Sequence, residues 1–174
     1  MALRTCKLTF AMLAVSNTSP LSNLAILDRL NLLREQFGSV TMPAAVRLEL
    51  SRLPNRAARH RLDIGVEEQW LCVVPLSGVV PVDLAVALDA GEAEALALAV
   101  QLNASIVLID ETAARQRARQ FHLPHTGVLG VLRQARLTGR IVSLRDEIMR
   151  LRKEARFFVA PALERALLIS VGEE

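Results

Sequence analysis

The chain contains an apolar run that ends on two acids, SIVLIDE at residues 105–111. Such a run is typical of a strand that is buried on both faces of a parallel sheet. A second run, LAVSN at residues 13–17, ends on an amide side chain. Because ligands of open parallel α/β sheets bind just beyond the carboxyl ends of the strands, the two runs predict one polar pocket there. Its acidic side chains would suit a divalent cation.

Strand-like and helix-like segments alternate along the rest of the chain. We expect strands at residues 13–16, 39–42, 71–76 and 105–109, and a short strand-like segment at 122–126. We expect helices at residues 22–37, 43–52, 82–88, 92–102, 111–121, 127–138, 143–152 and 161–168, and a weaker helical stretch at 56–70 that breaks near Gly65. This alternation predicts a layered α/β fold with a largely parallel sheet.

Length and composition are those of a single domain with a full core, at 174 residues and 52% hydrophobic content. No apolar run approaches the ~20 residues that a membrane span requires. Residues 1–11 match a signal peptide poorly, because their apolar stretch is short and no small-residue cleavage site follows. We therefore expect residues 1–11 to form a disordered extension and residues 12–174 to form the domain. Two cysteines without a CxxC motif favour a cytoplasmic location and argue against a zinc site.

The net charge is only +3, but the charges are unevenly distributed. Nineteen of the 21 basic residues are arginines, and none lies between Leu62 and Ala114, a stretch that holds nine acids. An acidic centre with arginine flanks fits a metal site beside a phosphate-binding rim, although a solvated mixture of charges would look similar. Aromatic residues make up 3% of the chain, so base stacking is not expected to dominate any RNA binding.

Asp110 and the pair Glu92 and Glu94 are the acids most suited to a pocket. Asp110 follows a buried strand directly, where it could ligate a metal, cap the next helix, or do both. Glu92 and Glu94 open a helix, and the helix dipole alone would stabilise acids there. They point roughly 200° apart, so at most one can face the pocket, and the register does not choose between them.

Other candidates are weaker on their own residues. Glu49 borders the buried stripe of the helix at 43–52, which favours a solvent-facing side chain. Asn17 has a carbonyl that can ligate Mg²⁺ without supplying charge, or it is a turn residue. Thr18 and Ser19 could hydrogen-bond to metal-binding acids.

Arg115 and Arg119 lie one helical turn apart, near Asp110 in the sequence. They could clamp a phosphate there, or simply form a solvated helix face. The chain has no GxxxxGK[ST], GxGxxG or GxSxG motif. The sequence therefore gives no support for a nucleotide-binding loop or a serine hydrolase.

Five segments together resemble the PIN-domain family, and most closely its VapC-like branch of predicted nucleases. They are VSNTSPL (15–21), PAAV with Glu49-Leu50 (43–50), LDAGEAEA (88–95), LIDE (108–111), and LP with TGVLGVL (123–132). The similarity runs from about residue 15 to residue 140. It implies a three-layer α/β/α fold with a mainly parallel central sheet of four to five strands.

The resemblance also implies an activity, because PIN proteins are Mg²⁺- or Mn²⁺-dependent ribonucleases. Many are toxins of toxin–antitoxin pairs and many form homodimers, so the implied partners are RNA, an antitoxin protein and a second copy, with no membrane. The family's metal pocket maps onto Asn17, Glu49, Glu92 and Asp110, with the three acids as catalytic residues. The family spacing selects Glu92 over Glu94.

Position 17 departs from the family pattern, because most PIN nucleases carry Asp there. Asn17 removes one negative charge, so we expect metal affinity to fall. The alternative function is therefore a catalytically weakened RNA- or protein-binding module. A phosphatase-type hydrolase is less consistent, since it would need an Asp nucleophile where the chain has Asn17.

Overall fold

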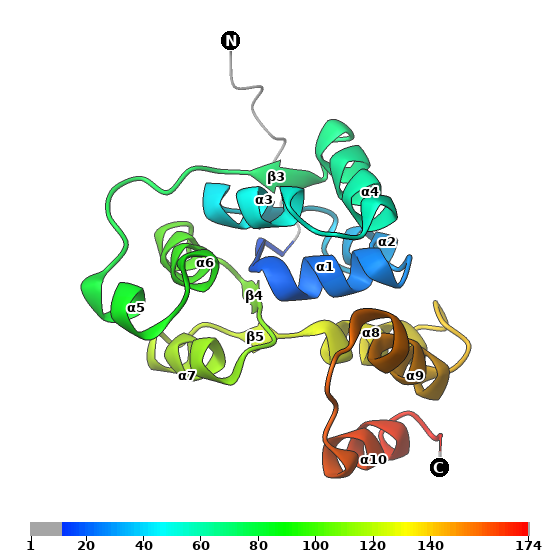
Figure 1. Ribbon diagram of the computed structural model, residues 1–174. Helices are drawn as coiled ribbons and strands as arrows, with labels where there is room; N and C mark the ends of the chain where they lie inside the picture. Colours follow the sequence, from blue (N-terminus) through cyan, green and yellow to red (C-terminus); the bar gives the residue numbers. More distant parts are fainter. Residues whose placement is uncertain (1–11, 174) are drawn as a thin grey trace.

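Five short strands form one parallel sheet in the order β3-β2-β1-β4-β5 in the computed structural model, which describes residues 12–173 (Figure 1). The strands are β1 (Ala14–Ser16), β2 (Val40–Met42), β3 (Leu71–Val73), β4 (Ile106–Leu108) and β5 (His125–Thr126). The expected parallel sheet is confirmed. The expected extension at residues 1–11 lies outside the described residues.

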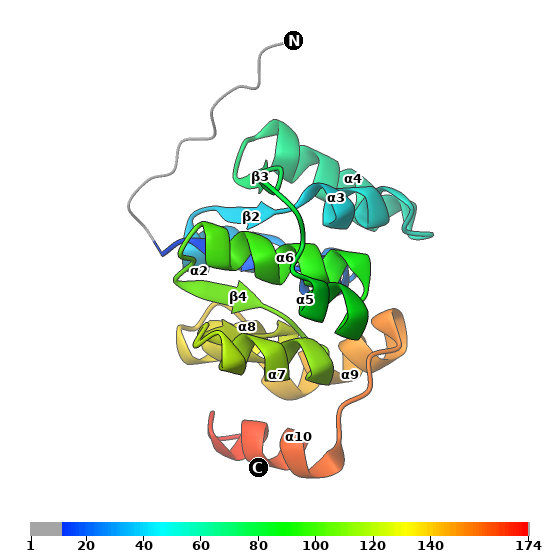
Figure 2. The ribbon, with the colours of Figure 1, turned by 90° about the vertical axis from the view of Figure 1, so that its left-hand side faces the viewer.

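The described residues form ten helices. They are α1 (Thr18–Ile26), α2 (Asn31–Phe37), α3 (Ala44–Ser51), α4 (Arg56–Glu67), α5 (Val82–Ala87), α6 (Ala90–Gln101), α7 (Thr112–Gln120), α8 (Val128–Leu137), α9 (Leu144–Ala155) and α10 (Pro161–Ile169). Helices α5, α6 and α7 lie on one face of the sheet, and α1, α2, α8 and α9 lie on the other (Figures 1 and 2). The arrangement is a three-layer α/β/α fold.

The pleat of the central strands divides the core into two halves. Val15 and Val107 are fully buried against α6, while Ala14 and Leu108 are fully buried against helices of the opposite layer. Because successive side chains of a strand point to opposite faces, both faces of β1 and β4 are apolar. This explains why their sequences are almost entirely apolar, with the buried Ser16 as the exception.

Two expectations for the helices were wrong. The segment at 22–37 is not one helix, because Asp28 adopts a left-handed backbone (φ 58°) between α1 and α2. Its leucine stripe continues across the break, so hydrophobic periodicity could not locate it. Gly65 does not break α4; a Cβ there would lie 2.8 Å from Leu71 Cδ1, so the glycine lets α4 pack closely on β3.

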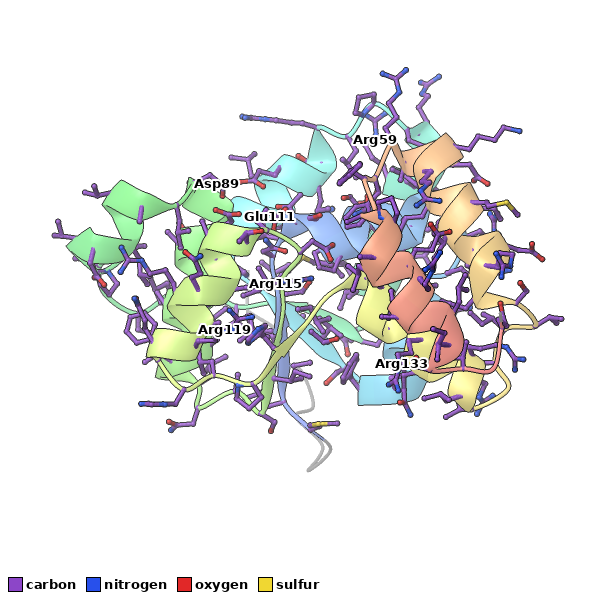
Figure 3. The ribbon with its side chains drawn as sticks, turned by 90° about the horizontal axis from the view of Figure 1, so that it is seen from below. Arg59, Asp89, Glu111, Arg115, Arg119 and Arg133 are labelled. Carbon is purple, nitrogen blue, oxygen red and sulfur yellow. The ribbon has the colours of Figure 1, made fainter. Side chains whose placement is uncertain are left out.

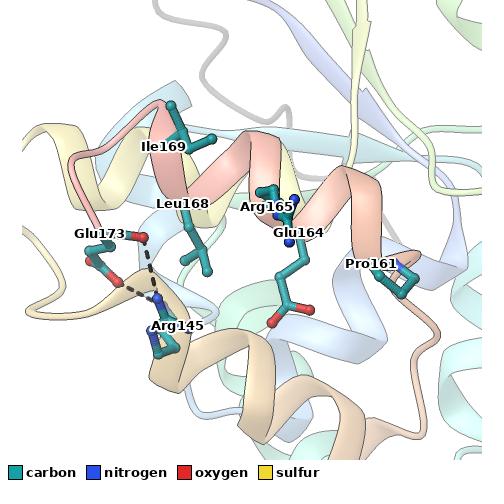
Figure 4. Close-up of a pocket in the computed structure, with 7 residues that line it drawn as sticks. All are labelled: Arg145, Pro161, Glu164, Arg165, Leu168, Ile169 and Glu173. Atoms are coloured by element: carbon teal, nitrogen blue, oxygen red, sulfur yellow. Dashed lines mark hydrogen bonds between the residues drawn. The ribbon is translucent and has the colours of Figure 1, made fainter.

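The C-terminal end is fastened to the start of α9. Glu173 accepts hydrogen bonds from the backbone amides of Leu144 (2.9 Å) and Arg145 (2.9 Å) and from Arg136 Nε (2.6 Å). A cavity of about 530 Å³ lies between α9 and α10 beside this contact (Figure 4). In the part of the chain that the structure describes, no helix has the length and apolar character needed to cross a membrane.

Candidate active site

The ends of β1 and β4 bring the two segments singled out in the sequence together. The strands pair in register, with Ser16 opposite Leu108, and the Asn17 amide continues the ladder by donating to the Leu108 carbonyl (3.1 Å). Asn17 and Asp110 therefore lie at the same edge of the sheet. This is the edge at which parallel α/β proteins bind ligands.

A cavity of about 260 Å³ opens at this edge. Its lining comes from α1, α3, α6 and the start of α7: Asn17, Thr18, Ser19, Ser22, Glu49, Asp89, Glu92 and Glu111. None of these described lining residues is basic. Asn17, Asp89 and Glu111 are the N-cap residues of α1, α6 and α7, so three positive helix ends face the four acids and offset part of their charge. Figure 3 shows the side chains of Asp89 and Glu111, which both line this cavity, at the starts of α6 and α7.

The surroundings of Glu92 and Glu94 settle which of them faces the pocket. Glu92 lines the cavity and forms a capping box with Asp89, whose Oδ1 accepts from the Glu92 amide (2.8 Å). The Glu94 carboxylate instead accepts from the backbone amide of Ala45 at the start of α3 (3.1 Å). Burial raises the pKa of Glu92, and the negative charges of Asp89, Glu111 and Glu49 raise it further. These carboxylates therefore share one electrostatic field.

Glu49 lies in the pocket, so the solvent-facing position favoured by its own residue pattern was wrong. Helix α3 packs against α6, which turns this side of α3 inward. The Thr18 hydroxyl donates to Glu49 Oε2. A Cβ on Gly91 would lie 2.6 Å from Glu49 Oε1 and 2.8 Å from Oε2, so the glycine makes room for this carboxylate.

Asp110 does not itself line the cavity; its side chain is 4% exposed and is bonded to Ser19, which does. Its Oδ2 accepts from the Ser19 hydroxyl (3.1 Å), and its Oδ1 accepts from the Val128 amide (2.9 Å). Asp110 thus caps α8, not the helix that follows it, because Glu111 is the N-cap of α7. Burial raises the pKa of Asp110 to about 6 against the hydrogen bonds from Val128 and Ser19.

The side-chain amide of Asn17 is buried in the pocket, and only one of its two ends is hydrogen-bonded. Only 2% of the residue is exposed, and its Nδ2 donates to Glu111 Oε2 (2.7 Å). Its Oδ1 is buried and has no hydrogen-bond partner among the described residues. A buried oxygen without a donor costs about 1–3 kcal/mol, so a bound positive group would relieve it.

The donor set fits a hard divalent cation such as Mg²⁺ or Mn²⁺, because it consists of carboxylate and amide oxygens. Within residues 12–173, however, no three His, Cys, Asp or Glu side chains converge closely enough to form a ready metal-binding group. Instead, Glu49 is held by Thr18 and Glu111 by Asn17. The residues present match the chemistry of a metal site, and a cation would have to draw them together.

The two arginines of the expected phosphate clamp have different surroundings (Figure 3). Arg115 Nε donates to the Ile109 carbonyl (2.9 Å), and its Nη2 lies 3.6 Å from Asp110 Oδ1. Arg119 is exposed, and no hydrogen bond or ion pair joins its side chain to any residue that the structure describes. Only Arg119 is therefore free to bind a ligand in solution.

Two pocket residues, Asp89 and Glu111, were missed as site residues. Both had a signal in the sequence. Asp89 stands three residues before Glu92, the spacing of a capping box that points its carboxylate to the same helix end. Glu111 follows Asp110 directly at the end of the apolar run at 105–111, where the strand end brings both into the pocket edge.

A family model matches nearly all of the described chain. The DUF3368 family model, which describes a PIN domain, matches residues 13–173. A search of curated proteins found no match to the chain. The matched range includes every strand and helix described above and all the residues that line the acidic cavity.

Proposed function

Because the chain belongs to the PIN-domain family, we propose that it is a metal-dependent endoribonuclease that hydrolyses RNA phosphodiesters, as the toxin component of a toxin–antitoxin system. PIN domains are in general nucleases, and the match covers nearly all of the described chain. The observation that carries the proposal is the buried, unpaired Oδ1 of Asn17 in a cavity with four acids. It indicates a site built to receive positive charge.

Asn17, Glu49, Glu92 and Asp110 are the residues that would hold Mg²⁺ or Mn²⁺. A divalent ion bound there would supply Lewis-acid stabilisation of charge on the phosphodiester and favour ionisation of the attacking water. The chain's own residues prepare the site, because Thr18 and Ser19 fix the carboxylates of Glu49 and Asp110 by hydrogen bonds.

Glu92 would bring a carboxylate to the cavity as one of the metal-binding residues. In the metal-free protein, burial and the charges of Asp89, Glu111 and Glu49 raise its pKa, so a bound cation would stabilise its ionised form. Arg119 is exposed in the last turn of α7, and we propose that it would contact the RNA backbone at a distance from the cavity. Together these residues would provide a metal ligand and a phosphate contact.

The proposed partners are RNA, an antitoxin protein and a second copy of the chain, in the cytoplasm. Val79, Val82 and Val86, on and before α5, are exposed and would offer a protein partner apolar contacts. Helix α5 comes just before Asp89 of the cavity lining in the chain. The sequence of the RNA target is outside this proposal.

The variant Asp110→Asn tests the proposal. We expect Mn²⁺-dependent cleavage of single-stranded RNA to fall by at least about 100-fold. Folding without metal should become more stable at pH 7.5, by up to about 3 kcal/mol, because ionising a buried carboxyl with a pKa of about 6 opposes folding above that pH. Cleavage that persists in a folded Asp110→Asn protein would contradict the assignment.

The second candidate function is a weakened RNA- or protein-binding module, and Asn17 is the observation that favours it. RNA cleavage assays on wild-type and Asn17→Asp proteins, both saturated with Mn²⁺, distinguish the two. A wild-type protein that binds RNA but cleaves it only after this substitution would support the module. Equal or lower activity in Asn17→Asp, beside an active wild type, would support the enzyme.

A further inference from the structure

We propose that Arg115 is a positioning residue that holds Asp110 in the active site, and that it does not bind RNA. Its guanidinium forms two contacts at the end of β4, from Nε to the Ile109 carbonyl (2.9 Å) and from Nη2 to Asp110 Oδ1 (3.6 Å). Only 33% of its side chain is exposed. Because its guanidinium already contacts two groups of the protein, this side chain is less available to bind a ligand.

The two oxygens of Asp110 have different partners. Oδ1 is turned toward Arg115 and the Val128 amide at the start of α8. Oδ2 accepts from the hydroxyl of Ser19, which lines the cavity. Arg115 and Val128 therefore hold one oxygen of the carboxylate, while the other lies on the side of the cavity.

Gly127 is the third part of this arrangement. A Cβ at this position would overlap Asp110 Oδ1 and would lie 2.5 Å from Arg115 Nη2 and 2.8 Å from the Ile109 carbonyl. The absence of a side chain lets carboxylate and guanidinium meet beneath the α8 backbone. Strand β4 and helices α7 and α8 are thereby joined at Asp110.

The fork of the guanidinium is essential to this role, because it reaches a carbonyl and a carboxylate at once. A lysine carries the same charge at one point and cannot reproduce both contacts. A residue that only attracts phosphate would tolerate lysine much better. Arg115→Lys and Arg115→Ala therefore distinguish positioning from RNA binding, with Arg117→Ala as a control on the same helix.

Amide hydrogen exchange measured by NMR tests the positioning directly and needs no catalysis. Exchange at Val128 should become at least about tenfold faster in both Arg115 variants, because its acceptor is no longer held. Exchange at Val131, which donates to the Gly127 carbonyl one turn later (3.0 Å), should change less than about twofold. Unchanged exchange at Val128, or Arg115→Lys behaving as the wild type, would overturn the proposal.

The kinetic test rests on the proposed function. The single-turnover cleavage rate at saturating protein should fall about tenfold in the Arg115 variants, with RNA affinity and its salt dependence unchanged. Arg119→Ala should weaken RNA binding and reduce the slope of log affinity against log salt by about 0.7, as loss of one phosphate contact would. A reduced salt slope in Arg115→Ala would overturn the proposal. A wild type that cleaves no RNA would contradict the ribonuclease, while the exchange test would still decide the role of Arg115.

Discussion

The substitution Asn17→Asp restores the acid common in the family, and the structure predicts that it destabilises the metal-free protein. Asn17 Nδ2 donates to Glu111 Oε2 across 2.7 Å, in a residue that is 2% exposed. A carboxylate cannot donate, so the substitution removes a hydrogen bond to a charged group and sets two negative charges against each other. The lost bond alone is worth about 1.5–3 kcal/mol, and two charges ~4 Å apart repel by about 4 kcal/mol at an effective dielectric constant of ~20.

The loss of unfolding free energy has an upper limit, or ceiling, because the introduced carboxyl can take up a proton and then donate to Glu111 as the amide does. With an ordinary aspartate pKa of about 3.9, that ceiling is about 5 kcal/mol at pH 7.5 and about 1.5 kcal/mol at pH 5. We therefore expect Asn17→Asp to lower the free energy of unfolding by about 3–5 kcal/mol at pH 7.5 and by far less at pH 5.

Urea denaturation in EDTA measures this loss at both pH values, and repetition with Mn²⁺ should recover much of it. The double variant Asn17→Asp/Glu111→Gln is the matched control, because it exchanges donor and acceptor and keeps the hydrogen bond. It should be markedly more stable than Asn17→Asp alone. An Asn17→Asp protein within about 0.5 kcal/mol of the wild type in EDTA at pH 7.5 would refute the reasoning.

Two further predictions concern Gly91 and Glu173. Gly91→Ala places a Cβ 2.6 Å from Glu49 Oε1, so the flexible carboxylate must move. We expect RNA cleavage to fall about tenfold or more, while the unfolding free energy changes by less than about 1 kcal/mol. Both quantities are measured on the same preparation. Burial disfavours the Glu173 carboxylate, but hydrogen bonds from the Arg145 and Leu144 amides and from Arg136 hold its pKa at about 2, below its ordinary 4.5. Figure 4 shows the bonds between Glu173 and Arg145. The stabilisation that the ionised Glu173 gives the fold is complete above pH 4.5 and is lost as the pH falls through about 2. Glu173→Gln should therefore lower the free energy of unfolding by about 1–2 kcal/mol at pH 7, after allowance for solvent screening. Urea denaturation should show a progressively smaller loss between pH 4.5 and pH 2. Equal losses at pH 7 and pH 3 would contradict that mechanism.

The parts of the site fixed by strand ends could be predicted from the sequence. The runs before Asn17 and Asp110 are mostly apolar because both faces of β1 and β4 are buried, and the strand register then brings the two residues to one edge. The break between α1 and α2 could not be predicted, because Asp28 carries no strong turn signal and the leucine stripe continues through it.

Other parts depend on contacts between residues that are distant in the sequence. The Glu94 side chain bonds to the Ala45 amide and does not line the cavity, and the packing of α3 on α6 turns Glu49 inward. Neither side-chain orientation follows from the sequence of the residue's own helix. Likewise, the Val128 amide makes Asp110 the cap of α8. Local periodicity places a side chain on a face of its helix, but tertiary packing decides what that face meets.

Calorimetric titration of the metal-free protein with Mn²⁺ tests most directly whether this pocket is a cation site. Glu92→Gln is the variant to compare, because glutamine preserves the capping box with Asp89 and removes only the charge. We predict saturable binding to the wild type at sub-millimolar Mn²⁺, on the order of the affinity expected for an oxygen-donor site, and at least about tenfold weaker binding to Glu92→Gln. The absence of saturable heat, or equal binding by both proteins, would contradict a metal site in this pocket.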